Sequence, residues 1–388
     1  MFKPYLTLLV GGSLLPILLS TKLLAAQLDV EETRLDTAKS AMPLQVSRYQ
    51  ALLDDLDLKY SQHTDELKVT DMVAHQGLRL WQQAVRDVQS GSMDDRPLYW
   101  SRLAMRTKLK TQKPGFNIVP WQQDILVKAV EKSSRGFSDI LFSEQTRIKI
   151  LLTGFDPFFL DRDISQSNPS GLVALALDGY RFTVNGKQAQ IETVMIPVRF
   201  ADFDNGIIES LLTPLYRDNS IDMVFTVSMG RDDFDLERFP GRNRSAAAPD
   251  NLNVLTGASA TNPIAPMLNN KTLNGPEFVE FSLPAKAMQS VQGKWKINDN
   301  HKVTTVSKGA FEADSLSSLA SETSVEGSGG GYLSNEISYR AVLLNQQFNR
   351  SSPVGHIHTP KVKGYDADTE TAIVEQVKQM IEAAAATL

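Results

Sequence analysis

Apolar residues in the first third of the chain recur at the spacing of an α-helix. In residues 46–56 they stand three or four positions apart, at Val46, Tyr49, Leu52, Leu53 and Leu56. Residues 73–88 and 121–130 show similar spacing, which gathers the apolar side chains on one face of a helix. The pattern therefore predicts a helical region over residues 27–145.

The pattern changes after Arg147. Residues 148–152 are a run of aliphatic residues that leads into Thr153-Gly154, as in a buried strand that enters a turn. Further strands are predicted over 191–198 and 223–227, with helices over 170–177 and 203–215. This alternation favours a three-layer α/β/α sandwich with a mixed, mostly parallel central sheet over residues 146–388, preceded by the helical region.

The last hundred residues contain one long polar segment. Residues 289–331 are rich in Ser, Gly and Glu, so we expect an extended, mobile insertion there. A helical pattern follows from Ser334, and the short apolar stretch at residues 354–357 is predicted to form a strand that ends at Pro360. Residues 369–388 are predicted to form a terminal helix with one apolar face.

Residues 1–26 have the pattern of an export signal. Lys3 precedes a mostly apolar stretch, and Ala25-Ala26 provides small residues near a cleavage point. The alternative is an uncleaved membrane anchor, although the apolar run is short for a span of about 20 residues and ends before Lys22. We therefore expect an exported protein, periplasmic or secreted, that contacts a membrane only if this segment is retained.

Composition narrows the range of functions. The 388 residues allow about two domains, and 42% hydrophobic residues are enough for a globular core. A net charge of -5 makes nucleic acid an improbable partner. The chain has no Cys, which excludes disulfides, thiolate metal sites and a Cys nucleophile. His63 and His75 have no neighbouring ligand pattern, so each is interpreted as a surface or packing residue.

Ser334 follows Gly329-Gly330-Gly331 at the start of a predicted helix. The first backbone N–H groups of a helix are free, and its positive dipole end can stabilise a developing oxyanion. Taken alone, Ser334 is better explained as a helix N-cap, for which Ser is a preferred residue.

His358 and Glu237 supply a possible base and its partner. His358 stands at the end of a predicted strand, where α/β sheets place their active sites. His356 points to the same face of that strand, but a metal site is improbable because no further ligand cluster is near. Taken alone, Glu237 is best explained as a solvated carboxylate.

Six stretches, in the same order, resemble the pyroglutamyl peptidase I family of cysteine peptidases. They are LTGFDPF at 152–158, NPS at 168–170, ER with PDN at 237–238 and 249–251, GP with SLP at 275–276 and 282–284, the segment 330–339 around Ser334, and GHIHTP at 355–360. The resemblance covers residues 147–388 and leaves the helical region outside it. The resemblance implies a phosphorylase/hydrolase-like sandwich that removes N-terminal pyroglutamate from peptides.

The resemblance also assigns roles. Glu237 and His358 match the family's catalytic Glu and His, and Ser334 stands at the position of its nucleophilic Cys. Substrate contacts are implied for four further residues, namely Phe155, Phe158, Met229 and Asn335. The implied reaction needs no metal or organic cofactor, and the implied partner is a peptide with a blocked N-terminus.

Three departures from the family keep other functions open. Ser334 replaces Cys, Ala247 replaces an Arg, and the loop before Gly230-Arg231 is about two residues shorter. A Ser–His–carboxylate site is competent when it is built as such, which supports a hydrolase. A binding protein that kept the pocket without its nucleophile is the first alternative. A structural or interaction protein, in which the helical region acts and the α/β part is a scaffold, is the second.

Overall fold

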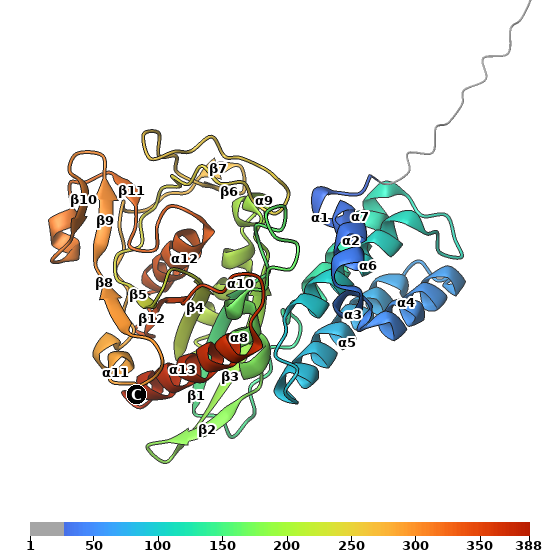
Figure 1. Cartoon of the computed structure of the whole chain (residues 1–388), viewed down its shortest axis with the longest axis horizontal. Helices are drawn as coiled ribbons and strands as arrows, with labels where there is room; N and C mark the ends of the chain where they lie inside the picture. The colour runs from blue at the N-terminus through green and yellow to red at the C-terminus, as the bar shows by residue number, and fades with distance from the viewer. Residues whose placement is uncertain (1–26) are drawn as a thin grey trace, which may run out of the picture.

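The computed structural model describes residues 27–388. Seven helices form the first part of the described chain: α1 (Val30–Thr33), α2 (Leu35–Ala41), α3 (Pro43–Ser47), α4 (Gln50–Gln62), α5 (Val69–Gln89), α6 (Arg96–Thr111) and α7 (Pro120–Ser133). They pack beside the rest of the molecule (Figure 1). The helix predicted over 46–56 is divided, because the chain turns at Arg48 and Tyr49, whose side chains both bond Asp87 of α5.

A seven-stranded sheet forms the centre of the second part. Its strands are β1 (Ile148–Phe155), β2 (Arg181–Val184), β3 (Lys187–Ile196), β4 (Met223–Met229), β5 (Phe234–Glu237), β8 (Ile297–Asn300) and β12 (Val354–Thr359), in the order β2-β3-β1-β4-β12-β5-β8. The pairs β3·β1, β1·β4, β4·β12 and β5·β8 are parallel, whereas β2·β3 and β12·β5 are antiparallel. The mixed, mostly parallel sheet confirms the predicted fold class.

Helices cover both faces of this sheet. One face packs against α8 (Pro169–Leu177) and α13 (Ala367–Ala385), with α11 (Ala285–Gln289) beside α13. The other packs against α10 (Ile207–Arg217) and α12 (Leu333–Gln347), with α9 (Phe200–Asp204) beside α10. Successive side chains of β1 point to opposite faces of the sheet. Ile150 lies in the core on the α8 and α13 side, and Leu151 lies in the core on the α10 and α12 side.

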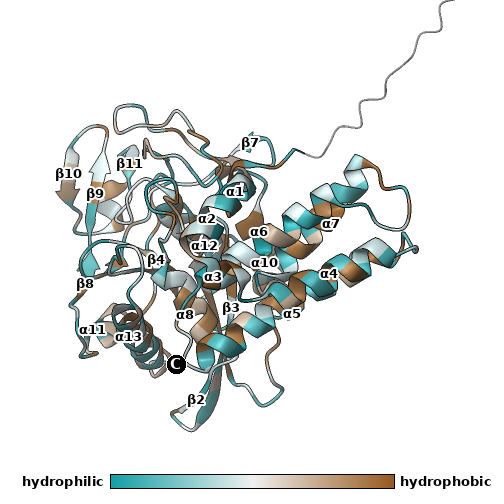
Figure 2. Ribbon diagram, turned by 45° about the vertical axis from the view of Figure 1, so that its right-hand side comes forward, coloured by the Kyte–Doolittle hydropathy of each residue, from teal (hydrophilic) through white to brown (hydrophobic). Residues whose placement is uncertain are grey.

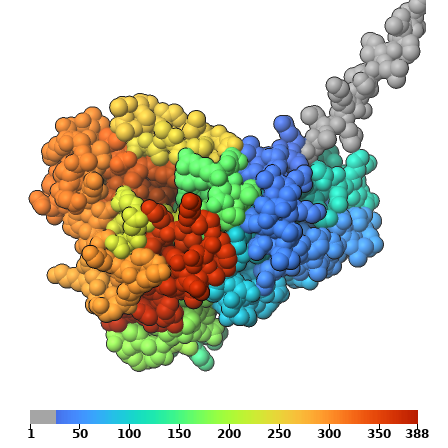
Figure 3. Space-filling view, in the orientation of Figure 1, coloured from blue at the N-terminus to red at the C-terminus, as the bar shows by residue number. Residues whose placement is uncertain are grey.

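The helical part shares a hydrophobic core with the sheet. Trp81 of α5 is fully buried in the same cluster as Leu172 of α8 and Ile150 of β1. In Figure 2 brown and teal residues alternate along α4 and α5, as expected for helices with one buried face. Figure 3 shows this part, in blue, in continuous contact with the remainder of the surface.

Buried ion pairs also hold the helical part against the sheet. Asp156, directly after β1, forms ion pairs with Arg102 of α6, at 2.8 Å, and with Arg135, at 2.7 Å. Arg199, after β3, lies 3.0 Å from Glu31 of α1. The helical part therefore holds the segments that follow two central strands.

The polar segment 289–331 is folded rather than extended without structure. It contributes β8 to the edge of the main sheet and forms a second sheet, in the order β10-β9-β11, from β9 (Lys302–Thr305), β10 (Gly309–Glu312) and β11 (Ser324–Glu326), with a short 3-10 helix at Leu316–Leu319. The prediction of an extended, mobile insertion is wrong, because Val303, Ala313 and Leu319 close a small core with Phe239 and Phe278. A hairpin of β6 (Met267–Leu268) and β7 (Lys271–Thr272) completes the elements.

The predicted export segment, residues 1–26, lies outside the described residues. Within residues 27–388, none of the helices combines the length and the apolar character that a membrane crossing requires.

Candidate active site

A cavity of about 350 Å³ opens at the carboxyl ends of the central strands, beside the N-terminus of α12. Its lining is contributed by the ends of β1 and β4, by the segment after β3, by the loop after β5 and by the start of α12. The lining residues are Phe155, Phe158, Phe159, Asn168, Val198, Ser228, Met229, Gly230, Ala246, Ala248, Tyr332, Leu333 and Ser334. This is the position at which open α/β sheets bind ligands.

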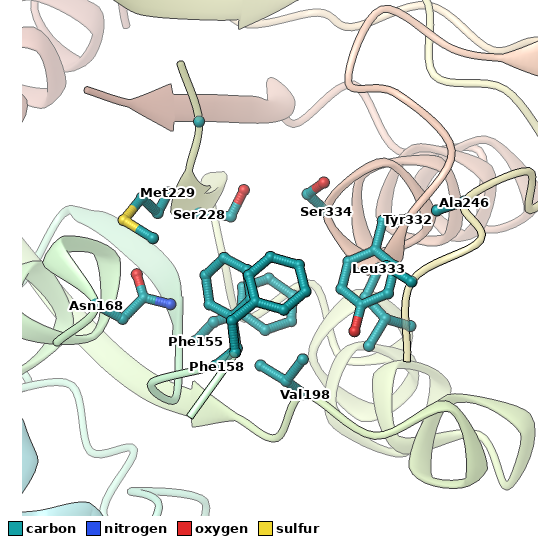
Figure 4. A pocket seen from close by; sticks show the side chains of 13 residues that line it. Phe155, Phe158, Asn168, Val198, Ser228, Met229, Ala246, Tyr332, Leu333 and Ser334 are labelled. Carbon is teal, nitrogen blue, oxygen red and sulfur yellow. The ribbon is translucent and has the colours of Figure 1, made fainter. Parts of the chain in front are cut away.

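Three of the four implied substrate-contact residues line the cavity. Phe155, Phe158 and Met229 do so, and Figure 4 shows the two rings between Asn168 and Tyr332. Asn335 does not, because both ends of its buried amide bond the backbone of Gly241, at 2.9 Å and 2.7 Å. The prediction of a substrate contact by Asn335 is wrong, and its amide instead ties α12 to the loop after β5.

Glu237 and His358 are joined at the interface of two strands. β5 and β12 run antiparallel, and Nδ1 of His358 lies 2.5 Å from Oε1 of Glu237. The second carboxylate oxygen of Glu237 accepts a hydrogen bond from Nδ2 of Asn300, at 2.8 Å. Glu237 is fully buried, so its interpretation as a solvated carboxylate is wrong. Burial raises the pKa of Glu237, while the adjacent His358 acts in the opposite direction.

His358 stands directly behind the cavity wall. A Cβ atom placed on Gly230, which lines the cavity, would lie only 2.6 Å from Cβ of His358. Glycine at position 230 therefore allows the chain at the end of β4 to lie this close to His358, because glycine has no side chain. Because Nδ1 is engaged by Glu237, Nε2 is the ring nitrogen left for proton transfer.

Ser334 lies in the first turn of α12 and lines the cavity. The N-cap of this helix is Tyr332, so Ser334 is not the capping residue. Its hydroxyl donates to the carbonyl oxygen of Gly329 at 3.3 Å. Among residues 27–388, no hydrogen bond joins Ser334 to His358. Both residues thus flank one cavity, with the serine proton directed elsewhere.

Charged side chains near the cavity are turned away from it. Arg242 pairs with Glu277, and Arg244 lies 2.6 Å from Glu336 and 2.8 Å from Asp204. Neither therefore replaces the Arg expected at Ala247, which is exposed. Within the described part of the chain, the cavity lining contains no charged side chain, so the cavity fits a neutral group.

Two polar contributions to this site could not be predicted from sequence patterns. Asn300 comes from the insertion and orients Glu237, because β8 pairs with β5 in a register that sets Asn300 opposite Glu237. Ser228, at the end of β4, lines the cavity and lies 2.8 Å from Nε2 of His356. Both depend on strand register, which the local sequence does not reveal.

Two family models match the chain. The model described as the PA0049 N-terminal domain matches residues 20–131, and the PA0049 C-terminal domain matches 149–316 and 296–363. The uncharacterized protein PA0049 of Pseudomonas aeruginosa is 29% identical over 394 aligned residues, which cover 78% of this chain and 71% of that protein.

Solved structures with some likeness include pyrrolidone carboxyl peptidase from the hyperthermophile Pyrococcus furiosus. One mutant of it is 21% identical, covers 62% of this chain and 100% of its own, and has a TM-score of 0.43. A structure from the study of that enzyme and its cysteine-free mutant is 20% identical, covers 61% and 98%, and has a TM-score of 0.41.

Proposed function

The chain belongs to the PA0049 family, whose C-terminal domain model spans more than half of it, and we propose that its α/β part is a hydrolase. The proposed reaction removes an N-terminal pyroglutamyl or related acyl group from a peptide. The observation that carries the proposal is the buried Glu237–His358 pair, placed behind a cavity that Ser334 lines. The six sequence stretches that resemble pyroglutamyl peptidase I support the same assignment.

The cavity suits this substrate class. A pyroglutamyl residue is a compact, neutral lactam ring, and Phe155, Phe158 and Val198 offer it apolar surfaces. An N-terminal residue with a free, charged amine would lose its hydration without gaining an acidic partner in the lining. The proposed substrate is therefore a peptide with a blocked N-terminus.

In the proposed mechanism, the Ser334 hydroxyl turns from Gly329 and transfers its proton to Nε2 of His358 as it attacks the acyl carbon. Glu237 holds the ring and stabilises its charged form. Backbone N–H groups at the start of α12 bind the oxyanion. His358 then returns the proton to the leaving amine, which departs and leaves an acyl-serine. Water, deprotonated by His358, cleaves that ester and restores Ser334. No metal or organic cofactor enters this sequence.

Two observations favour a second candidate, a protein that binds pyroglutamyl-type peptides without turnover or serves as a scaffold. The Ser334 hydroxyl donates its proton to Gly329 rather than to His358. In addition, Ala247 stands where the family has an Arg, and its neighbours Ala246 and Ala248 form that part of the cavity wall. A site tuned for a thiolate loses most of its activity when Ser replaces Cys, since Ser must be deprotonated during attack.

Hydrolysis of a fluorogenic pyroglutamyl amide separates the two candidates. The wild-type protein is compared with Ser334→Ala and Ser334→Cys, and folding is checked by thermal denaturation. Turnover by the wild type that vanishes in Ser334→Ala supports the serine hydrolase. A silent wild type with an active Ser334→Cys variant supports the binding protein. Undiminished turnover by Ser334→Ala would exclude Ser334 as the nucleophile.

We also propose that the protein is exported, on the evidence of the leader-like residues 1–26. Fractionation of producing cells, followed by N-terminal sequencing, tests this. A mature form that begins near residue 27 in the exported fraction supports a cleaved signal, a full-length form in the membrane fraction supports the anchor, and a full-length cytoplasmic form contradicts export.

A further inference from the structure

A second histidine on β12 holds a second serine of the cavity. His356 lies opposite Thr226 of β4 in the parallel register. Its Nδ1 is 2.8 Å from Oγ1 of Thr226, and its Nε2 is 2.8 Å from Oγ of Ser228. His356 is fully buried, whereas Ser228 lines the cavity. Figure 4 shows the hydroxyl groups of Ser228 and Ser334 on the same side of the phenylalanine rings.

The contacts of His356 determine where its proton lies. Burial, and to a lesser extent His358, hold the pKa of His356 well below its ordinary value, so the ring is neutral and carries one N–H. Thr226 Oγ1 lies 3.2 Å from the carbonyl oxygen of Gly355, to which it can donate. If it does, it accepts from Nδ1–H of His356, and Nε2 is then the acceptor for the Ser228 hydroxyl. This tautomer satisfies all four groups.

In this tautomer His356 accepts the Ser228 proton, so Ser228 presents lone pairs to the cavity. The other polar side chains of the lining are committed. Both ends of the Asn168 amide serve Ser170 and the Asp156 carbonyl, and the Tyr332 hydroxyl donates to Pro249 at 2.8 Å. Ser228 is thus a hydrogen-bond acceptor in a mostly apolar lining, and the other serine there, Ser334, donates its proton to Gly329 and is the proposed nucleophile.

We propose that Ser228 is a specificity-determining residue, which accepts a hydrogen bond from a ring N–H of the ligand. The proposal rests on the proposed function and deepens it, since it selects a lactam over a carbocycle of the same shape. When a ligand without an N–H buries the Ser228 acceptor, the hydrogen bond that the acceptor made with water is lost without replacement. This loss weakens binding of the wrong ligand by more than the new hydrogen bond strengthens binding of the right one.

Ser228 is a poor choice of nucleophile for the same reasons. Protonation of His356 would create a buried cation whose Nδ1 faces the Thr226 hydroxyl rather than a carboxylate. The Glu237–His358 pair offers the carboxylate that His356 lacks.

The test compares two small ligands that differ at one ring position. 2-Pyrrolidone carries N–H where cyclopentanone carries CH₂. Their dissociation constants are measured by NMR titration of the Ser334→Ala protein, in which turnover plays no part. We expect 2-pyrrolidone to bind about tenfold more tightly, the scale of one well-placed hydrogen bond. Adding Ser228→Ala should reduce that ratio to about one, whereas Ser210→Ala, at an exposed position of α10, should leave it unchanged.

Equal affinity for both ligands, or no binding of either, overturns the proposal. So does a ratio that survives Ser228→Ala, or mass-spectrometric detection of an acyl group on Ser228, which would make it a nucleophile. Failure of the proposed function has a different signature, since a wild-type protein that is silent on the pyroglutamyl amide can still show the lactam preference.

Discussion

Oε1 of Glu237 and Nδ1 of His358 lie 2.5 Å apart, although 121 residues separate them in the chain. The antiparallel pairing of β5 with β12 brings them together on the face of the sheet that α12 covers. Asn300 of β8 then fixes the remaining oxygen of Glu237. The carboxylate is therefore held on two sides, which fixes the orientation and tautomer of the imidazole.

The first prediction concerns Glu237→Gln. An amide of the same shape can still contact Asn300 and the ring, but it cannot stabilise a charged imidazole. We expect kcat on a pyroglutamyl amide to fall by on the order of 10³- to 10⁴-fold, with KM little changed. Steady-state kinetics of the folded variant measures both.

Asn300→Ala is the companion variant. It leaves the Glu237–His358 contact in place and removes one donor to the carboxylate, so we expect a smaller loss of kcat, about 10-fold. A Glu237→Gln protein that keeps more than a tenth of the wild-type kcat would contradict the proposed role of Glu237.

Sequence patterns predicted the sandwich because its strands and helices carry strong local signals. The aliphatic run of β1 and the amphipathic pattern of α13 can be recognised in the sequence without knowing which elements they pack against. The motif order also singled out Glu237, His358 and Ser334; the structure joins Glu237 to His358 and places Ser334 in the lining of the cavity beside them. Their catalytic roles remain a proposal.

The remaining features depend on partners distant in the chain. Residues 289–331 are polar because β8 lies at the edge of the main sheet, and because β9 in the small second sheet buries only alternate residues such as Val303. Glu237 looks like a surface carboxylate until β8 and β12 close over it. The Ser228–His356 contact requires the register of β4 on β12. None of these can be recognised in a local window of sequence.

The second prediction concerns Gly230→Ala. A Cβ atom at this position would meet Cβ of His358 at 2.6 Å and the Thr359 carbonyl oxygen at 3.1 Å, so the end of β4 or the imidazole must move. Displacement of the base by even about 1 Å costs on the order of 100-fold in rate. We expect kcat to fall by that factor. The measurement pairs kinetics with thermal denaturation, and a fully active Gly230→Ala protein would show that His358 is not the base.

The third prediction concerns the contact between the helical part and β1. Arg102 and Asp156 are both buried, 2.8 Å apart. Replacing Arg102 by Met removes the charge and three hydrogen bonds to Asp156 and Ser134. We expect the free energy of unfolding to fall by on the order of 3 kcal/mol, the scale for breaking a buried pair. Urea denaturation measures it.

Arg48→Met provides the matched control. Arg48 pairs with Asp87 at 2.8 Å, but its side chain is 40% exposed, and such pairs contribute at most about 1 kcal/mol. Equal losses of stability in the two variants would show that the Arg102–Asp156 contact does not hold the helical part to the sheet.

The last prediction concerns the dependence of stability on pH. Burial raises the pKa of Glu370 on α13 to about 8, and it also raises the pKa of Glu192 to about 7. The folded protein therefore binds protons that the unfolded chain releases above its ordinary carboxyl pKa near 4.3. Stability from these groups is complete below that value and is lost as the pH rises toward 8, by up to about 1.4 kcal/mol per pH unit for each proton.

Glu370→Gln tests the sign of this effect. The amide stays neutral at every pH, so the variant should lose less stability than the wild type between pH 6 and 8 in urea denaturation. Glu375→Gln, at an exposed position on the same helix, should follow the wild-type profile. Because Ser167 bonds Glu370 and neighbours Asn168 of the cavity wall, the same rise in pH should also loosen that wall. A wild-type profile that is flat or rises over this range would show that Glu370 is ionised in the folded protein.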